Sequence, residues 1–190
     1  MSVQRFTIDG YGQIELNNCA FRRDGRIEAQ CKLDATDFAS VPAENGMLLA
    51  VDNVNRVVRF VDASEDCPIA INYSTEHMYD ERTPGLKNFK ITRDSKGYFL
   101  PRLGYLAQGD KFTTNCFSYD TSDFANDAAV RAIALTGGSA IKVYASEYAA
   151  GDGTILLKKG SAPSGVKVLL KVIAVTTMPD GQFALKFQVL

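Results

Sequence analysis

The sequence predicts an all-β fold, a sandwich or a barrel-like arrangement of antiparallel hairpins, with at most one short helix and an N-terminal extended arm. Three observations support this fold class. Apolar residues alternate with polar ones at a period of two, the extended segments are short and separated by Gly, Pro, Asp and Asn, and no regular strand–helix alternation occurs. The chain has 190 residues, 46% of them apolar and 23% charged, so it can bury a substantial core.

The N-terminal segment is predicted to contain two hairpins. Phe6–Ile8 and Ile14–Leu16 flank the turn-prone Asp9–Gly12, a pattern typical of a small hairpin. Ile27–Leu33 alternates apolar and polar side chains, as a half-buried strand does. Asp24–Gly25, immediately before that strand, indicates the second hairpin, because both turn positions tolerate a positive φ.

The predicted domain division follows from the limited stability of a two-stranded ribbon. Such a ribbon is marginally stable in water, and the N-terminal residues offer few apolar side chains for a core of their own. We therefore expect residues 1–40 to form a β ribbon or arm and residues 41–190 to form a β-rich main domain. The composition changes most near residues 120–126, where the main domain could be subdivided.

The main domain is predicted to consist of short strands joined by turns. Two apolar runs, 47–51 and 56–61, predict a hairpin across the Asp- and Asn-rich residues between them. The C-terminal segments 166–176 and 183–189 predict another hairpin across Met178–Gly181. Further strand candidates are residues 69–73, 89–92, 98–106, 112–119, 141–145 and 154–157.

One segment, Ser122–Leu135, has features of a short helix. Ser122 is a candidate cap, five alanines follow it, and Gly137 and Gly138 end the pattern. Arg131 interrupts the apolar stripe of this segment. An irregular segment is therefore the alternative to a helix here.

Composition argues against several kinds of chemistry. The 21 basic and 22 acidic residues give a formal net charge of −1, which argues against bulk electrostatic binding of nucleic acid or of an anionic membrane. A single histidine, His77, rules out zinc sites that need two, and neither a phosphate-binding loop nor a nucleophile elbow is present. No apolar run approaches the length of a transmembrane helix. We therefore expect a protein that is not an enzyme and has no cofactor.

Two polar clusters have both a functional and a purely structural interpretation. His77 stands close to two carboxylates and could be part of a metal or acid–base site, but a solvated loop is the preferred interpretation. Asp120, Asp123 and Asp127 have ligand chemistry suited to calcium but lack the spacing of an EF-hand loop. We expect these aspartates to cap a turn or the start of a helix.

The cysteines indicate a chain whose thiols stay reduced. Cys19, Cys31, Cys67 and Cys116 are spaced 12, 36 and 49 residues apart, so no CxxC pair exists. The N-terminus lacks the apolar core of a signal peptide, so we expect a chain made in a cytoplasm. Four reduced thiols are therefore expected, with two disulfides as the alternative.

Aromatic and basic residues of the N-terminal arm are the candidate partner contacts. A thin ribbon has little core, so its aromatic side chains need another surface, either the main domain or another protein chain. The arginines cluster at the predicted hairpin tip, where they are either solvated or in contact with a polar partner surface. The residues predicted to contact a partner are Phe6, Tyr11, Phe21, Arg22, Arg23 and Arg26.

Four features together give the chain a resemblance to a known class of proteins. They are the N-terminal arm, the stretch Asn45–Asp52 (NGMLLAVD), the stretch Gly109–Asn115 (GDKFTTN) ahead of a strand, and the C-terminal hairpin. In this combination the chain resembles structural proteins of tailed bacteriophage virions, most of all head decoration or cement proteins. The resemblance implies a small β-rich protein without catalytic residues that binds the assembled capsid lattice and stabilises it.

The resemblance also implies partners and a location. The partners would be the major capsid protein or other virion proteins, and the chain would be a homo-oligomer, with a trimer as the first guess. Its place would be the virion, assembled in the cytoplasm of the bacterial host. Two alternatives stay open: another virion component, such as a tail or head-fibre adaptor protein, and a β-sandwich carbohydrate-binding module. The chain has no tryptophan to stack on a sugar, which weighs against the second alternative.

Overall fold

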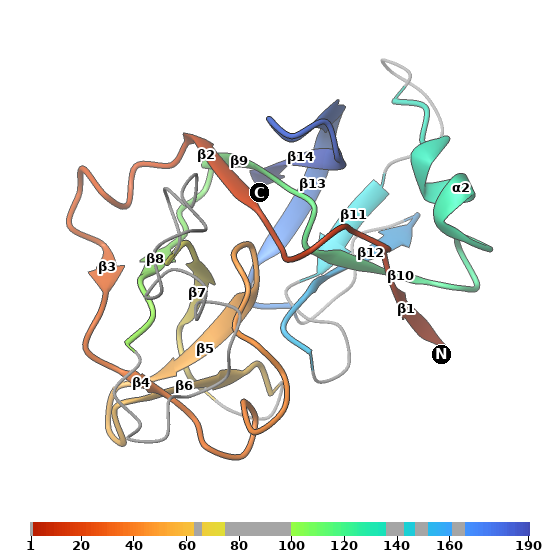
Figure 1. Cartoon of the computed structure of the whole chain (residues 1–190). Coiled ribbons are helices and arrows are strands. Elements are labelled where there is room, and N and C mark those ends of the chain that lie inside the picture. Colours follow the sequence, from red (N-terminus) through yellow and green to blue (C-terminus); the bar gives the residue numbers. More distant parts are fainter. Residues whose placement is uncertain (1, 63–65, 75–99, 136–142, 147–151, 161–165) are drawn as a thin grey trace.

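The computed structural model arranges the described strands in two β-sheets (Figure 1). It describes residues 2–62, 66–74, 100–135, 143–146, 152–160 and 166–190. The prediction of an all-β fold is confirmed, with one short helix in the described residues. His77 and the strand candidate 89–92 lie outside the described residues.

The larger sheet has eight strands, and the N-terminal segment supplies both of its edges. In spatial order its strands are β1 (Val3–Arg5), β10 (Phe117–Asp120), β12 (Ile155–Lys159), β11 (Val143–Ser146), β13 (Leu169–Thr177), β14 (Phe183–Val189), β9 (Lys111–Thr114) and β2 (Ile14–Asn18). Neighbouring strands of this sheet are antiparallel except for β10 and β12, which run parallel. Six of the eight strands therefore lie between the two N-terminal edges.

The smaller sheet has six strands and is curled. In spatial order its strands are β3 (Ile27–Glu28), β8 (Leu103–Tyr105), β7 (Ile69–Asn72), β5 (Leu48–Asp52), β6 (Val57–Phe60) and β4 (Lys32–Leu33). The strands β3 and β4 lie at opposite edges, although only residues 29–31 separate them in the sequence. The chain from Glu28, the last residue of β3, to Lys32, the first residue of β4, can span about 14 Å at most. In a flat six-stranded sheet the two edge strands would lie about 24 Å apart. The sheet must therefore bend until its two edges approach each other, as in an incompletely closed barrel.

Both hairpins predicted in the main domain are confirmed. The strands β5 and β6 are antiparallel, with Val51 opposite Val58. The strands β13 and β14 are also antiparallel, with a bulge between Val172 and Ala174. The turn Met178–Gly181 joins them, and its Gly181 has a φ of 87°. Each of these hairpins is local in sequence, so its turn residues were enough to predict it.

The two hairpins predicted for the N-terminal segment are wrong. The strand β1 pairs with β10, so Val3 lies opposite Asp120, and β2 pairs with β9, so Ile14 lies opposite Thr114. The predicted strand Ile27–Leu33 is divided between β3 and β4. The N-terminal segment therefore folds onto the body of this chain, because its strands pair with strands distant in sequence instead of with each other.

The segment Ser122–Leu135 combines a short helix with irregular structure. The helix α2 comprises Asp127–Arg131, and the side chain of its cap, Asn126, accepts a hydrogen bond from a backbone N–H of the first turn. The N–H and hydroxyl of Ser122 both donate to the Asp120 carboxylate, at 3.0 and 2.8 Å. Ser122 therefore belongs to a turn that precedes the helix. The helix begins at Asp127, with Asn126 and not Ser122 as its cap.

Two hydrophobic clusters form the core, and β5 contributes to both. Leu48 belongs to the larger, aromatic-rich cluster, in which the ring of Phe112 lies 5.5 Å from that of Phe187. Leu49 and Val51 belong to the smaller cluster, formed largely by residues of the curled sheet. All five residues of β5 are consequently buried, which explains why the first four of them are apolar.

The structure has all four cysteines as free thiols, two of them buried. Burial raises the pKa of Cys19 to about 12 and that of Cys31 to about 11, and burial also raises the pKa of Cys116. The thiolate is the reactive form of cysteine. These three thiols are therefore protonated at neutral pH and have a packing role.

Candidate functional site

The candidate functional site is the arginine loop, which we define as Ala20–Arg26, between β2 and β3. The structure brings the three arginines predicted as partner contacts together on this loop. Arg22 and Arg23 are exposed at its surface, and the side chain of Arg23 is 80% exposed. Arg26, at 29%, lies closer to the body of the protein.

A buried aromatic ring fixes the base of the arginine loop. Phe21 is fully buried, and its ring centroid lies 5.1 Å from that of Tyr73. The ring lies directly over Gly104 of β8, where an added Cβ would come within 2.4 Å of it. Only glycine permits this close approach, so Gly104 and Phe21 together attach the loop to the curled sheet.

The backbone of the arginine loop closes like the end of a helix. The N–H of Asp24 donates to the carbonyl of Ala20 at 2.9 Å, and the N–H of Arg26 donates to that of Phe21 at 2.8 Å. Gly25 lies between these bonds with a φ of 71°. This is the Schellman arrangement, in which a left-handed glycine ends a helical turn. A glycine with a positive φ occurs both in hairpin turns and at the ends of helical turns, so the pair Asp24–Gly25 alone does not distinguish the two.

Ion pairs of Asp24 and Arg26 hold the arginine loop against the body of the protein. The guanidinium of Arg26 lies 3.6 Å from the Asp110 carboxylate and 3.7 Å from that of Asp24, and it also donates to the carbonyl of Tyr105. Arg23 pairs with Asp24 at 2.8 Å, and this hydrogen bond lowers the pKa of Asp24. The loop is therefore ordered from within while Arg22 and Arg23 remain at its surface.

Replacing Gly25 with alanine is expected to lower the free energy of unfolding by about 1–2 kcal/mol, the strain of a left-handed L-residue. A Cβ at this position would meet nothing within 4 Å, so the effect comes from φ alone. Urea unfolding followed by circular dichroism measures it. Gly25→Asn is the matched control and should lose less, because asparagine tolerates this φ. Equal stability of all three proteins would contradict the turn.

The aromatic part of the predicted contact set needs correction. Phe6 is 2% exposed and Phe21 is 0% exposed, so neither ring faces a partner. The ring of Phe6 lies 4.8 Å from that of Phe117 and 5.3 Å from that of Phe183, inside the larger cluster. Tyr11 is half-buried. The main domain is the surface that covers Phe6 and Phe21, because the N-terminal segment lies along both sheets.

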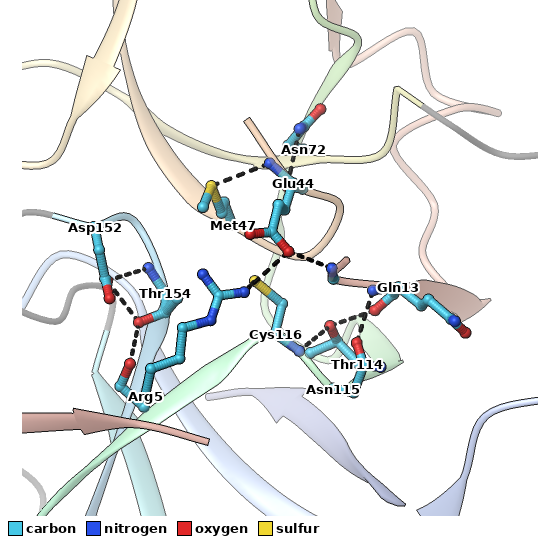
Figure 2. Close-up of polar contacts among 12 residues, drawn as sticks. Arg5, Gln13, Glu44, Met47, Asn72, Thr114, Asn115, Cys116, Asp152 and Thr154 are labelled. Atoms are coloured by element: carbon cyan, nitrogen blue, oxygen red, sulfur yellow. Dashed lines mark hydrogen bonds and ion pairs between the residues drawn. The ribbon is translucent and has the colours of Figure 1, made fainter. Parts of the chain in front are cut away.

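A group of polar residues lies where the two sheets meet (Figure 2). We call it the junction cluster, and it consists of Arg5, Gly12, Glu44, Asn72 and Cys116. Its centre is Glu44, 9% exposed, whose Oε2 accepts hydrogen bonds from Arg5 Nη2 at 3.0 Å and from the N–H of Gly12. The Asn72 amide donates to the carbonyl of Glu44 at 2.9 Å. Arg5 also lies 3.8 Å from the Cys116 sulfur. Glu44 thus joins strands of both sheets, β1 through its carboxylate and β7 through its backbone carbonyl.

The two sequence stretches that carry the resemblance pack against each other beside this cluster. Gly46, in the first stretch, has a φ of 88°, and a Cβ there would lie 2.2 Å from Thr114 Oγ1 in the second stretch. The Thr114 hydroxyl donates to the carbonyl of Gln13 at 2.5 Å and accepts from the N–H of Cys116 at 3.0 Å. Both stretches therefore determine how the two sheets are joined.

One feature of the sequence indicates the junction cluster. Glu44 is a charged residue just upstream of the apolar run that begins at Met47, where a buried carboxylate needs a partner. Its partner, Arg5, is 39 residues away in the sequence. Local pattern alone therefore indicates that a partner is needed but not which residue supplies it.

A surface groove of about 370 Å³ lies beside β1, α2 and the β13–β14 turn. The guanidinium of Arg131 covers part of it, 4.8 Å from the ring centroid of Phe6 and 5.2 Å from that of Phe183. Asp180, also on the groove, accepts a hydrogen bond from Gln13 at 2.6 Å. The Arg131 contacts cover the rings of Phe6 and Phe183 at the surface of the larger hydrophobic cluster.

The aspartates considered as calcium ligands have separate structural partners. Asp120 accepts from Ser122, Asp123 accepts from the N–H of Lys159 at 3.0 Å, and Asp127 accepts from the Tyr119 hydroxyl at 2.8 Å. Across the described residues, no group of three or more His, Cys, Asp and Glu side chains could hold a metal ion.

Comparison of the chain with protein-family models, with curated proteins and with solved structures finds no match. Within the described ranges, no helix is long and apolar enough to cross a membrane. A functional assignment therefore depends on the arginine loop and on the sequence features described above.

Proposed function

We propose that the chain is a non-enzymatic structural protein of a tailed bacteriophage virion, and that it binds the assembled capsid lattice and stabilises it. The arginine loop is the contact surface in this proposal. The major capsid protein is the partner, and the chain acts in the virion. The resemblance carried by Asn45–Asp52 and Gly109–Asn115 suggests the class of protein, and the loop supplies a means of binding.

The single observation that carries the proposal is the order of the arginine loop. Phe21 and Gly25 fix its backbone, while Arg22 and Arg23 remain exposed. A loop that is ordered before binding loses little conformational entropy when it binds. Arginine is also enriched at the centres of protein interfaces, where its guanidinium recognises carboxylates with two parallel hydrogen bonds. The loop therefore suits an acidic patch on a partner protein.

The way in which the two sheets are joined supports a mechanical role. The junction cluster connects both sheets through Glu44, which is 9% exposed, and the close approach of Gly46 to Thr114 packs the two stretches against each other. A protein that reinforces a lattice transmits load between its contact points, which favours a body with fixed internal geometry. Because a lattice repeats its binding sites, an oligomer of the chain would bind several of them, and modest affinities would add up through avidity.

Co-sedimentation with intact capsids tests the proposal. Purified chain is mixed with assembled capsids of the phage that encodes it and, in parallel, with tails purified from the same phage. We expect the chain to pellet with capsids and to saturate at a fixed number of copies per capsid. Failure to pellet with capsids at any maturation stage would overturn the proposal, and pelleting with tails alone would assign the chain to the tail instead.

Reversing two charges of the arginine loop is expected to weaken this binding about tenfold or more, as loss of interface hot spots does. The variant is Arg22→Glu with Arg23→Glu, and its melting temperature should stay near that of the unmodified chain because both side chains are exposed. The binding isotherm from the sedimentation assay measures the effect.

The matched control for the loop reversal is Lys159→Glu with Lys167→Glu, which changes the net charge equally at two exposed positions, one at the end of β12 and one just before β13. This control should bind like the unmodified chain. Equal weakening by both variants would show a dependence on net charge alone and would remove the loop from the proposal.

A further inference from the structure

A second exposed element adjoins the segment that follows the arginine loop and β3. The turn between β5 and β6, Asn53–Arg56, which we call the hairpin tip, is exposed at all four residues. Its Val54 is 90% exposed, far above the other large apolar side chains of the described residues, of which the next, Leu100, is 47% exposed. Burying an apolar side chain of this size from water is favourable, so Val54 is available for a contact with another molecule.

The hairpin tip is rigid although it is exposed. Asp52 Oδ1 accepts hydrogen bonds from the N–H groups of Val54 and Asn55, each at 2.9 Å. Asp52 Oδ2 accepts from the Asn55 side-chain amide at 2.7 Å and from Arg59 at 3.3 Å. The buried carboxylate of Asp52 thus fixes the backbone that presents Val54.

Arg56 adopts a strained backbone conformation at the end of this tip. Its φ is 55°, and within the described ranges it is the only residue other than glycine with a positive φ. Glycine would adopt this conformation without strain. Among the residues that the structure describes, the Arg56 side chain donates one hydrogen bond, a long one of 3.3 Å to the exposed Gln30. Strain of this kind at a non-glycine residue is typical of functional positions.

The hairpin tip adjoins the segment that follows the arginine loop and β3, and these parts of the curled sheet are basic. The N–H of Lys32 donates to the carbonyl of Arg56 at 3.1 Å, and the Arg56 side chain donates to Gln30 at 3.3 Å, so the tip is bonded to the segment between β3 and β4. Residues 20–32 and 53–56 together hold five basic and two acidic side chains, whereas the whole chain has a net charge of −1. The surface is therefore positive against a slightly negative remainder, which favours an acidic partner.

We propose that the hairpin tip is a second capsid contact, in which Val54 enters an apolar depression on the capsid protein and Arg56 pairs with a carboxylate at its rim. This inference rests on the proposed function, because it takes the same partner and extends the same surface. It explains why a strained arginine stands where glycine would be more stable, since the arginine side chain serves the partner and not the fold.

Two variants test the inference in the sedimentation assay. Arg56→Gly should raise the melting temperature by about 2–4 °C, because it removes the strain, and should still weaken capsid binding about tenfold. Val54→Asp should leave the melting temperature nearly unchanged, because the valine side chain is 90% exposed, and should weaken binding by a similar factor. Val175→Asp, at a valine that is 39% exposed on β13, is the matched control and should bind normally.

The outcomes separate this inference from the proposed function. If the unmodified chain binds capsids and both tip variants bind equally well, the inference is overturned while the proposed function stands. A lower melting temperature for Arg56→Gly would also overturn it, because the strain argument would then be wrong. If the unmodified chain does not bind capsids, the proposed function and this inference both fail.

Discussion

Gly46→Ala should destabilise the protein by about 2–5 kcal/mol, combining the strain of a left-handed alanine with overpacking at a buried contact. Gly46 has a φ of 88°, and its new Cβ would lie 2.2 Å from Thr114 Oγ1 and 3.0 Å from Cys116 Cβ. Neither neighbour moves easily, because Thr114 is hydrogen-bonded on both sides and Cys116 is buried. Unfolding in urea followed by circular dichroism measures the loss, since the chain has no tryptophan for fluorescence.

Gly109→Ala is the matched control for Gly46→Ala. Gly109 has a φ of 90°, but a Cβ there would meet nothing within 4 Å. Its replacement should destabilise the protein by about 1–2 kcal/mol through backbone strain alone. The difference between the two variants therefore isolates the packing of the two stretches against each other. Equal losses would contradict the close approach of Gly46 to Thr114.

Glu44→Ala is expected to lower the free energy of unfolding by about 2–4 kcal/mol. Removal of one partner from a fully buried ion pair costs about 3–5 kcal/mol, and here the Arg5 side chain is 31% exposed, so water can solvate it in part. The N–H of Gly12 loses its acceptor as well. Urea unfolding measures the change.

Two control variants show which property of Glu44 matters. Glu44→Gln keeps an oxygen that can accept the hydrogen bonds from Arg5 and Gly12, so it should lose less stability than Glu44→Ala. Asp24→Ala removes a carboxylate from an exposed pair, which contributes little to stability, and should leave the unfolding curve close to that of the unmodified chain. If Glu44→Ala behaved like Asp24→Ala, the junction cluster would not hold the sheets together.

The sequence predicted the parts of the fold that depend on neighbouring residues. The hairpins β5–β6 and β13–β14 were predictable because each turn and both of its strands are contiguous in the chain. The strands β1 and β2 pair instead with β10 and β9, across long intervening segments. A period of two shows that these segments are extended but carries no information about which distant strand each one pairs with.

The candidate site was predictable in part for the same reason. Charge and turn residues placed Arg22 and Arg23 at an exposed position, and the structure places them there. Phe21, next to them in the sequence, is buried, because its ring is covered by distant residues such as Tyr73 and Gly104. The strain at Arg56 was not predictable, since arginine is rare at a positive φ and nothing in the local sequence requires it.

Electron cryomicroscopy of capsids saturated with the purified chain tests the central claim most directly. The account predicts density for the chain at repeating lattice positions on the capsid, with the arginine loop at the contact with the capsid protein. Capsids without added density, or density in which Arg22 and Arg23 face away from the capsid, would contradict it.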